Sequence, residues 1–112
     1  MSTETTRGTV PDAELDTAVE VLRLLADRTR LAILALLHDG ELSVGAIAER
    51  LARPVPGISQ HLAKLRTGRL VTTRREGATV HYRLANEHID ALVLNVLHQA
   101  EHLRYDTPPH HR

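Results

Sequence analysis

The sequence predicts a mainly α-helical fold with one β-hairpin, the winged helix–turn–helix, and three observations support this prediction. Apolar residues recur at helical spacing along most of the chain. Two short helical patterns in its middle are separated by about four residues, as in a helix–turn–helix. After Gly68 the apolar period changes from about 3.6 residues to about 2, which is typical of strands.

Length and composition limit the class of protein. The chain has 112 residues, of which 42% are apolar and 25% charged, as in one soluble globular domain. There is no apolar run of membrane-span length and no signal-peptide pattern, so we expect a cytoplasmic protein that does not bind membranes. Cysteine is absent, which excludes disulfides, thiolate metal sites and a cysteine nucleophile.

We expect the chain to divide into three segments. Residues 1–11 are polar and lack periodicity, which predicts a disordered tail. Residues 12–104 carry the periodic patterns and form the expected winged helix–turn–helix domain, whose first and last helices would dimerise. Residues 105–112 form a tail that contains histidine.

Caps and breakers give the expected limits of the elements. Asp12 is the expected cap of the first helix and Ser43 of the third, and the residue before Pro54 disfavours a helix and ends the third. Glu76-Gly77-Ala78 makes the turn of the hairpin. The expected helices cover about 12–25, 31–39, 43–52, 56–68 and 87–103, and the expected strands 70–75 and 79–84.

The distribution of charge points to a nucleic acid. The formal net charge is zero, which taken alone argues against a polyanionic partner. Residues 53–83, however, hold seven basic side chains against one acidic side chain, a net +6. A local basic patch is what phosphate binding requires, whatever the total charge. Because this basic block covers the fourth helix and the hairpin, double-stranded DNA is the expected partner.

The fourth helix is the expected reading helix, because the second helix of a helix–turn–helix enters the major groove. Gln60 can make a bidentate contact to adenine, and Ser59 lies near the helix N-terminus, where the helix dipole favours a phosphate. The alternative is a polar face that contacts only solvent. The predicted DNA-binding residues are Pro56, Ser59, Gln60, His61 and Lys64 on this helix and Arg74 and Arg75 on the hairpin.

Four motifs, in order, resemble the ArsR/SmtB family of bacterial metal-responsive repressors. They are residues 25–34 (LADRTRLAIL), 41–45 (ELSVG), 59–65 (SQHLAKL) and 80–84 (VHYRL). The resemblance covers residues 15–105 and implies a homodimer that represses at an operator and releases it when an inducer binds. The family's arsenite, cadmium and lead sensors carry thiolates in the third helix, and such a site is excluded here because the chain lacks cysteine.

Histidine is in excess near the end of the chain. Of eight histidines, five lie in the last 25 residues. His88 and His102 lie within roughly 40° of one helix face but about 21 Å apart along its axis. One helix therefore cannot bring both to one ion. Two antiparallel copies about a two-fold axis can, and they would form two equivalent sites.

The same segment resembles the mycobacterial nickel/cobalt-sensing branch of the family in its Glu-His, Glu-His and terminal His-His pairs. Five or six nitrogen and oxygen donors suit Ni²⁺ or Co²⁺ better than four-coordinate Zn²⁺, which stays the alternative metal. Asn86 departs from the family's zinc-type site, which has an Asp there. The ligands that the resemblance implies are His88, Glu101, His102, His110 and His111.

Three further alternatives compete with metal sensing. The histidine-rich tail could bind nothing specifically, or the repressor could respond to a signal that is not a metal. A metal-dependent hydrolase is disfavoured, because the His/Glu cluster lacks a candidate base beside a substrate cleft. We therefore expect a regulator and not an enzyme.

Overall fold

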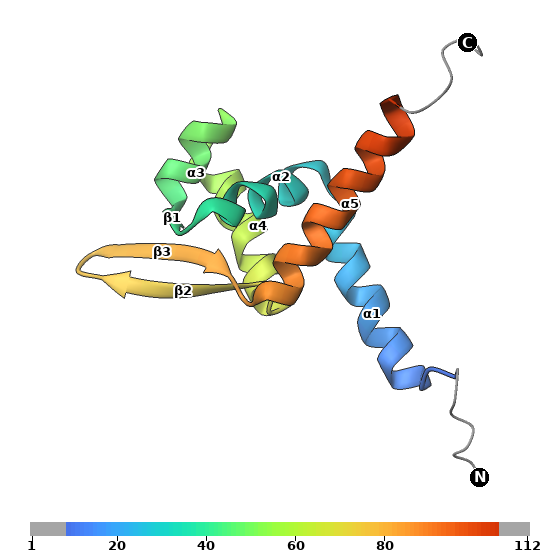
Figure 1. The fold of residues 1–112 in the computed structure, drawn as a ribbon. Helices are drawn as coiled ribbons and strands as arrows, with labels where there is room; N and C mark the ends of the chain where they lie inside the picture. The colour runs from blue at the N-terminus through green and yellow to red at the C-terminus, as the bar shows by residue number, and fades with distance from the viewer. Residues whose placement is uncertain (1–8, 106–112) are drawn as a thin grey trace.

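The computed structural model describes residues 9–105, and Figure 1 shows their arrangement. These residues form a mainly α-helical fold with a β-hairpin, which confirms the predicted fold class. The elements in chain order are α1 (Asp12–Leu25), α2 (Arg28–Leu36), a short 3₁₀-helix η2 (Leu37–Asp39), β1 (Leu42–Ser43), α3 (Val44–Leu51), α4 (Val55–Thr67), β2 (Val71–Glu76), β3 (Thr79–Leu84) and α5 (Glu87–Tyr105).

Side-chain caps explain where several helices begin. Asp27, Ser43 and Asn86 each accept a hydrogen bond from the backbone N–H three residues further on, at the starts of α2, α3 and α5. The first helix differs from our expectation. Asp12 is its first helical residue and not its cap, because Pro11 occupies the cap position and makes no side-chain bond. Asp12 still stabilises this end through the helix dipole.

The helices α3 and α4 form the helix–turn–helix. Ala52, at a φ of 55°, takes the left-handed conformation that ends α3, and Pro54 then occupies the cap position of α4. Pro56 lies in the first turn of α4, where its missing N–H breaks no helical hydrogen bond.

The hairpin pairs β2 with β3 in antiparallel register, and Gly77 at its turn has a φ of 62° that favours glycine. The sheet also contains a strand that we did not predict. In β1, Leu42 pairs with Tyr82 and Ser43 with His81, so the sheet order is β1-β3-β2. Two residues are too few to show an alternating pattern, so the sequence carries no signal for this strand.

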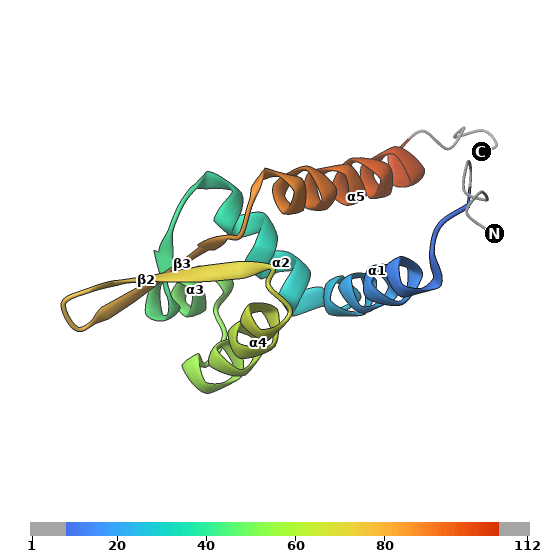
Figure 2. The same cartoon turned by 90° about the horizontal axis from the view of Figure 1, so that it is seen from below.

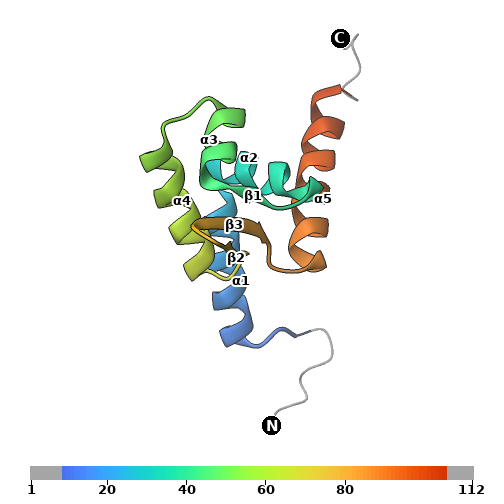
Figure 3. The same cartoon turned by 90° about the vertical axis from the view of Figure 1, so that its left-hand side faces the viewer.

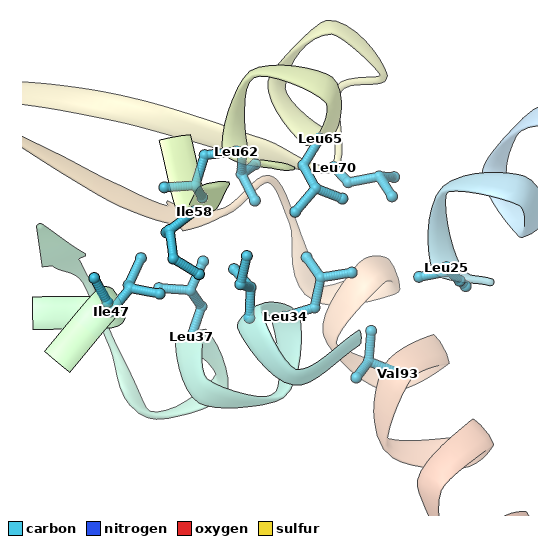
Figure 4. Packing of buried hydrophobic residues seen from close by; sticks show 12 residues of the cluster. Leu25, Leu34, Leu37, Ile47, Ile58, Leu62, Leu65, Leu70 and Val93 are labelled. Carbon is cyan, nitrogen blue, oxygen red and sulfur yellow. The ribbon is translucent and has the colours of Figure 1, made fainter. Parts of the chain in front are cut away.

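The core lies among α2, α3, α4 and the base of the hairpin (Figure 4). Of its twelve buried residues, ten lie between residues 33 and 71, whereas α1 supplies only Leu25 and α5 only Val93. The helix–turn–helix and hairpin therefore form one packed unit, to which the two terminal helices are attached.

The terminal helices extend away from this unit. Both α1 and α5 project from the side opposite the hairpin tip (Figures 1 and 2). The reading helix α4 lies on the other side of the hairpin from α5 (Figures 2 and 3). Within residues 9–105, no helix has the length and apolar character needed to cross a membrane.

Candidate nucleic-acid interface and metal ligands

The outer face of α4 carries four of the five predicted DNA-binding residues of this helix. Its inner face is apolar, because Ile58, Leu62 and Leu65 are buried in the core. The helical period then turns the remaining positions outward. The exposed predicted residues are Pro56, Ser59, Gln60 and Lys64.

His61 occupies a different position from the one predicted. Its ring is 26% exposed and lies against the corner between α1 and α2. Its Nδ1 is 3.4 Å from Nη1 of Arg30 and 3.8 Å from Oδ2 of Asp27. The backbone N–H of Arg30 donates to the same Asp27 carboxylate and holds the pKa of Asp27 below its ordinary value. The predicted outward direction of this imidazole is therefore corrected.

The two hairpin arginines point to opposite faces of the sheet, because successive strand residues alternate. Arg74 lies opposite His81, and its guanidinium donates to the Glu41 carboxylate, with Nη2–Oε1 and Nε–Oε2 distances of 2.7 and 3.1 Å. This ion pair holds the pKa of Glu41 below its ordinary value. Arg75 lies opposite Val80, on the face that Tyr82 shares. Only Arg75 therefore presents its charge without this carboxylate partner.

A cleft between α4 and the hairpin adds two residues that sequence reasoning missed. It has a volume of about 470 Å³, and Ser59, Arg66, Thr67 and Tyr82 line it together with two apolar residues of α4. The hydroxyl groups and the guanidinium of these side chains are donors that suit a backbone phosphate. Arg66 could have been found, because it lies seven residues after Ser59 and thus on the same helix face. The position of Tyr82 in the cleft depends on the strand register, so the sequence alone does not reveal it.

The proposed metal ligands within the described part of the chain all lie on α5. His88 lies in the first turn of this helix, and Glu101 and His102 lie near its end; all three are exposed. In residues 9–105, no three histidine or carboxylate side chains of one chain gather as a metal site would require. His110 and His111 lie outside the described residues. In one chain, His88 and His102 lie near opposite ends of α5.

The start of α5 is tied to η2 by a second histidine contact. His38 Nδ1 lies 2.7 Å from Oδ1 of Asp90, and this carboxylate raises the pKa of His38 above its ordinary value. This contact joins two elements whose residues lie 52 positions apart in the sequence.

The fold and the exposed face of α4 define a winged helix–turn–helix protein, and comparisons place it among known ones. A family model described as a helix-turn-helix domain matches residues 25–74. The chain is 50% identical over 103 residues to the HTH-type transcriptional regulator KmtR of Mycobacterium tuberculosis, covering 92% of this chain and 79% of that protein. It is 39% identical over 90 residues to the transcriptional repressor SmtB of the same species, covering 80% and 67%.

A solved structure agrees with these relatives. The homodimeric winged helix-turn-helix DNA-binding domain of Mb0332 from Mycobacterium bovis, described as ArsR-family, superposes with a TM-score of 0.80 at 35% identity. The match covers 90% of this chain and 96% of that one. The chain belongs to the ArsR/SmtB family of transcriptional regulators, which confirms the resemblance of its motifs. Its relatives are regulators and not enzymes.

Proposed function

We propose that the protein is a homodimeric, cytoplasmic repressor that binds operator DNA and releases it when a transition metal binds to α5. The observation that carries DNA binding is the polar outer face of α4 beside a hairpin that presents Arg75, with Arg66 between them. The major-groove contacts would come from Pro56, Ser59, Gln60 and Lys64, and the phosphate contacts from Arg66, Arg75 and Tyr82.

A second copy of the chain is the proposed partner of the terminal helices. Leu15, Val19 and Leu22 of α1 are 42–55% exposed at i, i+4 and i+7 spacing, so they form one apolar stripe. Val96 of α5 is also exposed, and α5 projects away from the hairpin tip as α1 does (Figure 2). The Mycobacterium bovis structure of the same fold is homodimeric, which supports this occupant.

The metal ligands would be His88, Glu101 and His102, completed by His110 and His111. Imidazole and carboxylate donors fit Ni²⁺ or Co²⁺. One helix cannot bring residues 88 and 102 to the same ion, but in a dimer residue 88 of one copy would face residue 102 of the other. A bound ion would supply a cross-link between the paired helices. Histidine binds a metal in its neutral form, so protons should compete with the metal for these ligands and acid should weaken the metal response.

The test is a titration of DNA binding with Ni²⁺, Co²⁺ and Zn²⁺, followed by fluorescence anisotropy. The probe is a duplex enriched from a random-sequence pool by the metal-free protein. We expect Ni²⁺ or Co²⁺ to weaken binding by about 5–150-fold, the usual range of allosteric coupling. A stronger response to Zn²⁺ would reassign the metal, and no response to any of the three would disprove metal sensing.

Two substitutions test whether the metal response and DNA binding depend on different residues. His102→Ala should abolish the metal response and leave metal-free DNA binding intact. Gln99→Ala, at an exposed position of the same helix, is the matched control and should keep both. If His102→Ala weakens metal-free DNA binding equally, the residue has a structural role instead.

A further inference from the structure

We propose that His61 is a positioning residue, which together with Arg30 and the contact of Gly68 with Leu24 sets the angle of the reading helix α4 against α1. This inference rests on the proposed DNA binding and dimerisation. It assigns His61, which the SQHLAKL motif includes, to the orientation of the reading helix and not to contact with DNA.

Arg30 is the first part of this contact. Its Nε donates to the carbonyl oxygen of Leu24 at 2.8 Å and its Nη2 to that of Arg23 at 3.3 Å. These carbonyls lie in the last turn of α1, where helical partners are missing and where the helix dipole favours a cation. Nη1 of the same guanidinium lies 3.4 Å from His61 Nδ1. Because a guanidinium only donates, His61 accepts through Nδ1 and joins α4 to the end of α1.

Gly68 is the second part. A Cβ atom at this position would collide with Cδ1 of Leu24, so a larger residue here would require the Leu24 side chain to move. Residues 61 and 68 lie on the same face of α4 and are separated by about 10 Å along its axis. Both contacts converge on Leu24, whose carbonyl is bound through Arg30 and whose side chain meets Gly68. Two contacts at this separation define the direction of a helix, whereas one would allow it to rotate.

Away from this corner α1 and α4 separate. An open groove of about 560 Å³ lies between them, with Thr17 and Glu20 of α1 on one side and Lys64 of α4 on the other. The contacts that Arg30 and Gly68 make with α1 lie in its last turn. The rest of α1 carries the apolar stripe of Leu15, Val19 and Leu22. A change in how two copies pack would accordingly reach α4 through Leu24 and Arg30.

The experiment is a double-mutant cycle on DNA affinity, with the duplex enriched by the wild-type protein as the probe. His61→Ala should weaken binding about tenfold, the value of a hydrogen bond to a charged group. His61→Gln, whose amide oxygen can accept from Arg30, should stay within about twofold of the wild type. Arg30→Ala should weaken binding to a similar degree, and the double variant no further, because the two residues act as one unit.

Gln60→Ala is the matched control, since Gln60 is the exposed neighbour of His61 on α4. Its effect should add to that of Arg30→Ala and should alter sequence preference, as expected of direct base contact. Urea unfolding of each variant checks that the fold persists. If Arg30→Ala does not fold, Arg30→Gln replaces it in the cycle with the same expected lack of additivity, because it also removes the guanidinium that joins His61 to the end of α1.

Two outcomes would overturn the inference. One is wild-type affinity of His61→Ala. The other combines two results: His61→Gln binds DNA as weakly as His61→Ala, and the effects of His61→Ala and Arg30→Ala add. Together these results would show that the imidazole contacts DNA itself. If the wild-type protein enriches no duplex at all, the proposed function is wrong and the inference fails with it.

Discussion

The apolar side chains are mostly buried in the reading unit, which consists of α2, α3, α4 and the hairpin, and mostly exposed on the terminal helices α1 and α5. Between residues 33 and 71, ten apolar residues are buried, and Ile33, Leu34, Ile47, Leu62 and Leu65 have no exposed surface. Of the eight large apolar residues that are most exposed in the described part of the chain, six belong to α1 or α5. A single chain therefore completes the core of its reading unit but leaves the surfaces of its terminal helices uncovered.

The two regions meet two different requirements of a regulator, a constant shape for DNA binding and a surface that can respond to a signal. The reading unit must keep one shape whatever the state of the sensor, and a core closed within one chain provides that. The sensor must respond to its surroundings, and surfaces that are completed only by a second copy allow this response. The corner at Leu24, Arg30 and His61 is one of the places where the two regions meet.

The largest expected effect follows from removing core volume in the reading unit. Leu34→Ala should lower the free energy of unfolding by about 2–5 kcal/mol, because the surrounding core cannot fully collapse. Leu15→Ala, at a position 48% exposed on α1, should change it by about 0.5 kcal/mol or less at concentrations where the dimer dissociates. Urea unfolding measures both, and equal effects would contradict the distinction between the regions.

A charge on the apolar stripe of α1 is expected to separate the two copies. Leu22→Glu should give a monomer by analytical ultracentrifugation and weaken DNA binding about a hundredfold, because the second half-site contact is lost. Ala13→Glu places the same charge on another face of α1 and should leave the dimer intact. A dimeric Leu22→Glu variant would mean that another surface pairs the two copies.

The hairpin arginines offer a smaller test within the reading unit. Arg75→Gln should weaken binding to all sequences and reduce the slope of log affinity against log salt concentration by about 0.9, the loss of one phosphate contact. Arg74→Gln should change the slope less, because Glu41 already binds this guanidinium. Equal slopes for the two variants would mean that DNA displaces Glu41.

The smallest expected effect concerns acid stability. Because the Arg74 ion pair lowers the pKa of Glu41 in the folded protein, its contribution to stability is complete above the ordinary value of 4.5. It is lost as pH falls through the lowered pKa. Below pH 4.5 the thermal midpoint of Glu41→Gln should therefore fall less than that of the wild type, which a plot of thermal midpoint against pH would show. An unchanged profile would show that this exposed ion pair contributes nothing measurable.

Sequence reasoning succeeded where signals are local and failed where they are not. Helical periodicity and caps such as Ser43 predicted the helices, and alternation predicted the hairpin, because these patterns act over a few residues. Strand β1 and the partner of His38 depend on contacts between distant segments. Arg74 and His61 were assigned to DNA by their charge and chemistry, although Glu41 and Arg30 occupy them in the fold.

The sequence alone determined that this chain is a winged helix–turn–helix of the ArsR/SmtB family, that its DNA-reading charge lies in residues 53–83, and that thiolate sensing is excluded. The fold class, the charge and the lack of thiolates follow from composition and spacing, and the family follows from the resemblance of the four motifs; folding changes none of them. Only the tertiary structure decided which basic side chains remain available, since ion pairing depends on what the fold brings opposite each strand face. It also decided that the reading helix meets the last turn of α1, because the approach of Gly68 to Leu24 and of His61 to Arg30 joins segments more than 30 residues apart.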